Sequence, residues 1–167
     1  MKTILKSFLF VLLISSCAQV YFVDPLPQKG LVIKSFIDEV QGVYGDSLLE
    51  VEVLKNELIV GGDRYQLCSK SPGEKEVLVK FYNDFYFANF KDSSFYSVFM
   101  GKFYENKLAI YMLNADAHSI NRLKKMVTVQ TLDSTKQSYL IQPTKKQFDQ
   151  MVNSELFDVV NVMDKRD

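Results

Sequence analysis

Tryptophan is absent from this 167-residue chain, which also contains only two cysteines and one histidine. Because a structural zinc site usually needs four Cys or His ligands, the sequence has little material for one. An excess of positive charge is missing as well. The 20 Lys and Arg residues balance 20 Asp and Glu, which argues against a protein that coats nucleic acid. A composition of 47% hydrophobic and 24% charged residues is that of an ordinary globular chain, and the length suits a single domain.

The N-terminus lacks a hydrophobic run long enough to cross a membrane. Its uncharged apolar segment, residues 8–14, is far shorter than the roughly 20 residues that a transmembrane helix needs. Lys2 and Lys6 precede this segment, and the small residues Ser15 and Ser16 follow it, as in a secretory signal peptide. We therefore predict that residues 1–16 are a signal peptide and not part of the fold.

The next residue gives this segment a more specific meaning. The stretch Ile14-Ser15-Ser16-Cys17 resembles the lipobox of bacterial lipoproteins, which has an aliphatic residue, two small residues and then cysteine. The resemblance implies that the Cys17 sulfur receives a diacylglyceryl group, that the signal is cut before it, and that the new amine is often acylated too. One acyl chain anchors a protein only marginally, whereas two or three hold it on a bilayer. The alternative is an ordinary secreted protein in which Cys17 is incidental.

The residues after Cys17 bear on the membrane in which a lipoprotein is placed. In enteric bacteria an Asp at the next position retains lipoproteins at the inner membrane, but this chain has Ala18. The acidic run that often accompanies export to the cell surface is missing too. By this resemblance we expect the outer membrane, facing the periplasm. Cleavage removes two lysines and no acid, which leaves 18 basic against 20 acidic side chains.

The mature chain divides into a short proline-containing start and one β-rich domain. We expect residues 17–30 to be the lipidated cysteine and an extended linker, although the apolar patch 20–23 is expected to pair with the domain as a strand at least as often as it stays free. In the domain, residues 31–167, strand patterns dominate. Around 49–53, for example, apolar and acidic residues alternate with period two. Strands joined by short turns pair antiparallel.

We accordingly predict a mainly β fold, an antiparallel up-and-down meander that is curled or barrel-like, with two or three short helices. One or two helical turns are expected within 31–40. A short amphipathic helix is expected around 120–126, where apolar residues recur every third position. A third helix should follow Thr144, because Thr144 and Gln147 have the spacing of a capping box.

Aromatic residues are concentrated in one part of the chain. Residues 81–111 contain twelve of them, and two similar turns, 80–84 and 102–106, each follow an aromatic pair. Both faces of the strand 95–104 are strongly apolar. That strand is therefore either central between two layers, or it lines a cavity for an apolar ligand, or it contacts a partner. The candidate ligand or partner surface consists of Phe85, Phe87, Tyr96, Phe99, Phe103, Tyr104 and Tyr111.

Gly42-Val43-Tyr44 has a second, fainter resemblance, to the Gly-x-Trp opening of lipocalins. That family would imply an eight-stranded barrel carrying a hydrophobic ligand. The chain departs from it by having Tyr44 in place of tryptophan, more than eight strand candidates, and helices between its late strands. As a whole the mature chain resembles small β-rich lipoproteins of unassigned function, and this resemblance implies no activity.

No catalytic pattern stands out. Asp116, His118 and Ser119 are close in sequence, but neighbours two residues apart rarely aim at one another as a triad requires. We therefore predict a membrane-anchored, non-catalytic binding or interaction module in the cell envelope. We expect no metal, cofactor or nucleic acid, membrane lipid as the partner of acylated Cys17, and a hydrophobic ligand or an envelope protein as the further partner. The alternative is an envelope hydrolase with an unrecognised carboxylate site.

Overall fold

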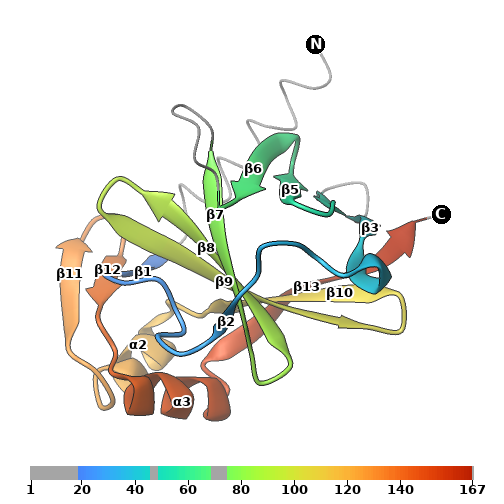
Figure 1. The fold of residues 1–167 in the computed structure, drawn as a ribbon. Coiled ribbons are helices and arrows are strands. Elements are labelled where there is room, and N and C mark those ends of the chain that lie inside the picture. Colours follow the sequence, from blue (N-terminus) through green and yellow to red (C-terminus); the bar gives the residue numbers. More distant parts are fainter. Residues whose placement is uncertain (1–18, 46–48, 69–74, 167) are drawn as a thin grey trace.

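A closed barrel of nine strands forms the centre of the molecule (Figure 1). The computed structural model describes residues 19–45, 49–68 and 75–166, so the predicted signal peptide and Cys17 lie outside the described residues. Around the ring the strands follow the order β10 (Lys107–Leu113), β13 (Phe157–Arg166), β3 (Gly42–Gly45), β4 (Glu50–Val53), β5 (Glu57–Val60), β6 (Asp63–Leu67), β7 (Glu76–Tyr82), β8 (Phe85–Asp92) and β9 (Phe95–Tyr104). Pairing of β9 with β10 closes it.

The remaining elements cover one side and one end of this barrel. β1 (Gln19–Phe22), β12 (Ser138–Ile141) and β11 (Val129–Asp133) extend the sheet from β9, and β2 (Leu31–Val32) pairs with β7. The 3-10 helix η1 (Asp38–Val40) precedes β3, and the two α-helices are α2 (Ala117–Leu123) and α3 (Lys145–Asn153). α3 begins with the predicted capping box, in which the Thr144 side chain accepts a hydrogen bond from the Gln147 N–H and the Gln147 side chain accepts one from the Thr144 N–H.

The prediction of a mainly β, barrel-like fold is confirmed, while the simple antiparallel meander is only part of the arrangement. Strands β3–β6 and β7–β10 are successive antiparallel neighbours. However, β1 pairs with β12 and β6 with β7 in parallel, and β13 is inserted between β10 and β3. Parallel pairing usually needs a long connection; β1 and β12 have one because most of the domain lies between them, whereas β6 and β7 pair in parallel over only two residues across the short connection 68–75. The ring has nine strands rather than the eight that the lipocalin resemblance implies.

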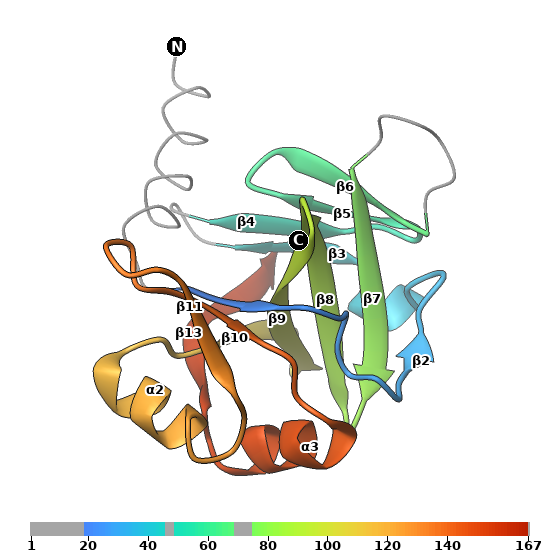
Figure 2. The same cartoon turned by 90° about the vertical axis from the view of Figure 1, so that its left-hand side faces the viewer.

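Two hydrophobic cores lie on opposite faces of the β8–β10 wall. The barrel core is inside the ring, where strands β3–β6 run across β7 and β8 (Figure 2). The outer core lies between the outer face of the wall and the layer formed by β1, β12, α2 and α3. Strand β9 faces both: Val98 and Met100 belong to the outer core and Phe103 packs against the barrel core. Of the three interpretations of this strand, the structure therefore supports the central one.

The two similar aromatic turns are both tight hairpin corners with two successive residues at positive φ. Asn83 and Asp84 connect β7 to β8 with φ of 49° and 64°, and Glu105 and Asn106 connect β9 to β10 with φ of 47° and 60°. Two successive residues with positive φ match the twist of antiparallel strands. Asn and Asp tolerate this region, whereas Glu, which has a longer side chain, is disfavoured there.

We predict that Glu105→Gly stabilises the protein by about 0.5 to 1 kcal/mol, because glycine adopts positive φ without steric cost. Urea unfolding followed by circular dichroism measures the change. Glu76→Gly is the control, since Glu76 is an exposed residue with strand conformation at the start of β7, where glycine should destabilise. Equal destabilisation by both substitutions would show that the turn stores no strain.

Residues 19–30 are part of the folded domain. β1 pairs with β12 over four residues, and the Val23 N–H continues the pairing by donating to the Ile141 carbonyl at 3.1 Å. Phe22 and Leu26 are fully buried in the outer core. The segment expected to be partly linker and partly strand thus joins the domain along its length, because its apolar side chains bury more surface there than they would in a free tether.

Candidate functional site

The structure divides the seven predicted surface aromatics between two faces. Phe87 is fully buried in the outer core, and Phe85, Tyr96 and Tyr111 pack against that core half-buried. Because successive residues of a strand point to opposite faces, Phe99 and Phe103 lie on the other side of the wall. The seven residues therefore do not form one surface. Four of them pack in the outer core, between the barrel and the layer that covers it.

Phe103 and Tyr104, whose side chains leave β9 on opposite faces, both line a pocket between η1 and the β9–β10 turn. The pocket has a volume of about 290 Å³, just below the range of about 300 to 1,000 Å³ for small-molecule sites. Its lining residues are Glu39, Val40, Tyr44, Phe103, Tyr104, Glu105, Asn106 and Lys107. Three of these residues are aromatic, Tyr44, Phe103 and Tyr104, and are called the aromatic wall below; three others, Glu39, Glu105 and Lys107, are charged.

Fixed contacts hold the aromatic wall in place. The Tyr44 ring lies 5.4 Å from that of Phe103 in an edge-to-face arrangement, and its hydroxyl donates to the Val40 carbonyl at 2.9 Å. The Lys165 Nζ lies 6.0 Å from the centre of the same ring. Burial raises the pKa of the Tyr44 hydroxyl above its ordinary value, so it is a neutral hydrogen-bond donor at physiological pH. Tyr44 is therefore held in the pocket wall, and its hydroxyl is already engaged in a hydrogen bond.

The other side of the pocket is more exposed and more polar than the side formed by Tyr44. Tyr104 is 40% exposed and offers a ring that a ligand can cover. Lys107 Nζ is 3.0 Å from Asp164 Oδ1, and this hydrogen bond is the main reason that the pKa of Lys107 is raised. Glu39 and Glu105 add two acidic groups. The pocket therefore combines aromatic surface with polar groups of both signs, which suits a small ligand with an apolar body and a polar end.

Inside the ring, side chains fill the space beside this pocket. Tyr44, Val53, Val77, Val79 and Met163 are all at most 1% exposed and belong to the barrel core. Tyr86 contacts Phe103 edge to face at 5.3 Å and Phe81 at 4.9 Å, which extends the packed aromatic cluster. A ligand bound at the pocket would rest on this core instead of replacing it.

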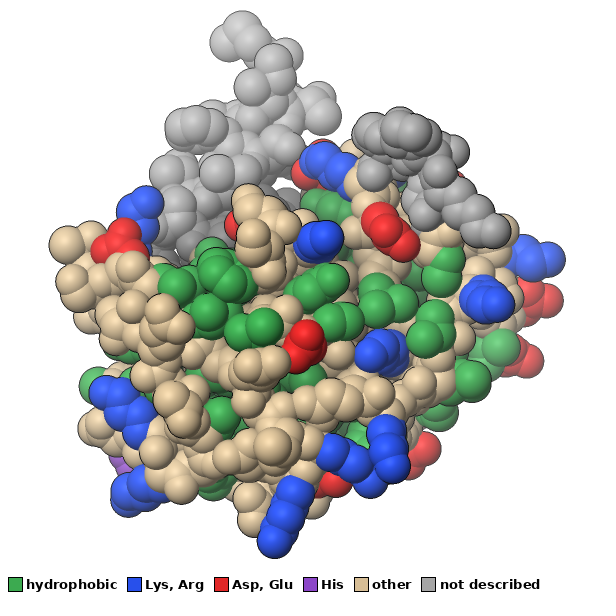
Figure 3. Space-filling view, turned by 60° about the vertical axis from the view of Figure 1, so that its left-hand side comes forward, with side chains coloured by type: hydrophobic (Ala, Val, Ile, Leu, Met, Phe, Trp, Pro, Cys, Tyr) green, Lys and Arg blue, Asp and Glu red, His purple; other side chains and the backbone are tan. Residues whose placement is uncertain are grey.

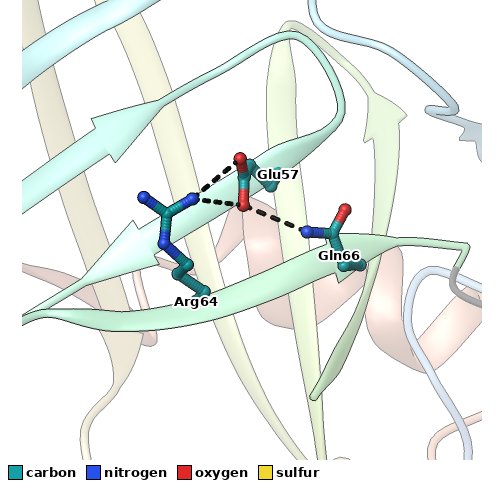
Figure 4. A network of polar contacts seen from close by, with 3 residues as sticks. All are labelled: Glu57, Arg64 and Gln66. Carbon is teal, nitrogen blue, oxygen red and sulfur yellow. Dashed lines mark hydrogen bonds and ion pairs between the residues drawn. The ribbon is translucent and has the colours of Figure 1, made fainter. Parts of the chain in front are cut away.

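The carboxylates that form ion pairs join different parts of the fold. Glu57 accepts two 3.1 Å hydrogen bonds from Arg64 and one of 3.0 Å from Gln66 on the outer face of β5 and β6 (Figure 4). Glu50, Asp63 and Asp164 pair with Arg166, Lys75 and Lys107. In each of these pairs the carboxylate oxygen lies 2.9 to 3.1 Å from the nitrogen of its partner.

The residues around His118 have a structural role as well. Asp116 caps α2 by accepting the Ser119 N–H at 2.8 Å, and this bond is the main cause of its lowered pKa. His118 is exposed on the first turn of the helix. Asp116 therefore serves the helix and does not orient the histidine.

Sequence reasoning missed the polar residues that hold the N-terminal segment. Asn89 in β8 and Lys80 in β7 are both buried and lie on the outer face of the wall. Lys80 Nζ donates to the carbonyls of Pro25 and Pro27 at 3.1 and 2.8 Å. Burial lowers the pKa of Lys80, and the nearby charge of Asp24 opposes this shift. The available signal was that Asn89 and Lys80 lie within apolar strands, since a polar residue there needs a partner.

Two wider features complete the description. Within residues 19–45, 49–68 and 75–166, no group of three or more His, Cys, Asp or Glu side chains is placed to hold a metal ion. In the same part of the chain, neither α-helix combines the length and hydropathy that a membrane crossing requires. Comparison with known proteins finds no matching family model, no matching curated protein and no matching solved structure.

Proposed function

We propose that this protein is a bacterial lipoprotein that is anchored in the cell envelope through acylated Cys17, on the outer membrane and facing the periplasm, and acts as a non-catalytic binding module. The observation that carries the binding role is the pocket beside η1, whose aromatic wall is fixed by Tyr44 and Phe103 while Tyr104 stays accessible. The lipobox residues Ile14 to Cys17 carry the anchoring role.

The pocket favours a small ligand over a long acyl chain. Its volume of about 290 Å³ is at the small end for ligand sites, and the barrel core next to it is filled. Tyr104 would cover one face of an apolar group, and the charged side chains around it would select the polar end. This narrows the expected hydrophobic ligand to a compact one.

Mass spectrometry of the mature protein tests the anchoring. The expected N-terminus is Cys17 with two or three acyl chains, and Cys17→Ser should move the protein from the membrane fraction to the soluble fraction. An unmodified Cys17, or a mature chain that starts elsewhere, would contradict lipidation. This result is independent of the pocket.

Fluorescence titration with N-phenyl-1-naphthylamine, a compact neutral aromatic probe, tests the pocket. We expect Tyr104→Ala to weaken probe binding about 3- to 10-fold, because an aromatic contact is worth roughly 0.5 to 1.5 kcal/mol. The control is Val160→Ala, which shortens an exposed apolar side chain on β13, away from the pocket lining. If Val160→Ala weakens binding and Tyr104→Ala does not, the probe binds the β13 surface and the pocket is not the site.

A further inference from the structure

The start of the fold lies unusually close to the proposed lipid anchor. β1 begins at Gln19, only two positions after Cys17. Two residues span at most about 7 Å even when fully extended. A domain of this size has a radius of gyration of about 15 Å and is therefore roughly 40 Å across. The chain between anchor and domain is thus far shorter than the domain.

Gln19 is itself firmly part of the sheet. Its N–H donates to the Gln137 carbonyl at 3.2 Å, and it pairs with Ser138 in the parallel β1–β12 ladder. Burial of Phe22 and Leu26, and the bonds of the Leu26 backbone to Asn89, hold the segment that follows. The domain cannot gain length by releasing β1 without losing these contacts.

From these distances we infer that the barrel is held directly against the lipid bilayer, with the β11–β12 hairpin and the start of β1 turned toward the headgroups. This inference rests on the proposed lipidation of Cys17. The partner is the bilayer surface itself, and the short stretch of chain before the described fold is what selects it. A longer spacer would instead let the domain tumble or reach a distant partner.

The register of the sheet shows which residues lie nearest to the bilayer. Gln19 pairs with Ser138, and Ser138 pairs with Asp133, so these three residues form one row across β1, β12 and β11. Two strand spacings put Asp133 about 10 Å from Gln19. Leu132, next to Asp133 at a register shift in β11, is 38% exposed. An exposed leucine therefore lies close to the anchor.

The test of this orientation needs an exposed position far from the anchor. Figure 3 shows the face between the views of Figures 1 and 2, where hydrophobic side chains form a band with charged side chains around it. β2 supplies the reference position. Leu31 in β2 is 68% exposed and lies across the molecule from the β11–β12 hairpin in Figure 2, four strands from β1 along the sheet.

The absence of tryptophan allows a direct test, because one introduced tryptophan is the only one in the chain. Full-length protein carrying Leu132→Trp or Leu31→Trp is processed in bacteria and reconstituted in vesicles of phosphatidylethanolamine and phosphatidylglycerol with brominated acyl chains. We expect quenching of the Leu132→Trp emission to be at least threefold stronger than that of Leu31→Trp, although Leu31 is the more exposed position. Equal quenching, or stronger quenching at position 31, would overturn the inference.

A variant with a longer spacer provides a second test of the inference. Twenty Gly and Ser residues inserted between Ala18 and Gln19 have a root-mean-square length of about 25 Å, and should abolish the difference between the two positions while membrane attachment persists. Acylation of each sample is checked by intact mass. An unacylated protein counts against the proposed anchor, whereas an acylated protein without the quenching difference counts against the orientation alone.

Discussion

Phe87→Ala is expected to lower the free energy of unfolding by about 3 to 5 kcal/mol, the largest effect of any single truncation that we predict. Phe87 has no exposed surface and joins the outer face of the barrel to α3. Its ring meets that of Phe148 edge to face at 5.4 Å, and Phe148 in turn meets Phe157 at 6.3 Å. Truncation would leave a cavity between sheet and helix that neither rigid layer can close.

Urea unfolding, followed by circular dichroism, measures this loss. Phe95→Ala is the matched control, since Phe95 is only half-buried at the start of β9, and should cost less than half as much. Sequence patterns placed Phe87 on a ligand or partner surface, so the experiment separates the two roles. Unchanged stability with weakened binding of the naphthylamine probe would mean that Phe87 serves as a surface residue.

Local patterns predicted much of the fold because strand alternation and capping are local. The alternation around 49–53 corresponds to β4, Thr144 caps α3, and both aromatic turns are corners of hairpins. Each of these depends on neighbours within a few residues. The same is true of the two faces of β9, where side-chain alternation fixes which residues share a side.

Long-range contacts could not be predicted in this way. The parallel pairing of β1 with β12 joins residues more than 100 positions apart, and nothing in either strand specifies its partner. The pocket has the same origin, because η1 and the β9–β10 turn meet only when the ring closes. Tyr44 was noticed through a resemblance and Tyr104 through its aromatic surroundings, but Glu39 and Lys107 gave no local signal.

Asn89→Ala is expected to cost about 3 kcal/mol, and its effect should concentrate on the N-terminal segment. The Asn89 amide is 1% exposed. Its oxygen accepts the Leu26 N–H at 2.6 Å, and its nitrogen donates to the Leu26 carbonyl at 2.8 Å. Further bonds of 3.0 Å reach the carbonyls of Leu78 and Phe87. Each buried polar group left without a partner costs about 1 to 3 kcal/mol, and Leu26 would have two.

Hydrogen exchange at the Leu26 amide and tryptic cleavage after the exposed Lys29 both report on this segment, and Asn89→Ala should accelerate both. Asn114→Ala, which removes two exposed hydrogen bonds, one donated to Asp158 and one accepted from the Asp116 N–H, should change neither by more than about twofold because exposed polar contacts contribute little. Retained protection in Asn89→Ala would show that Phe22 and Leu26 hold the segment by burial alone. If the segment does open, residues 18–30 all become tether, so the same substitution should also weaken the quenching difference between positions 132 and 31 and link this buried amide to the orientation at the membrane.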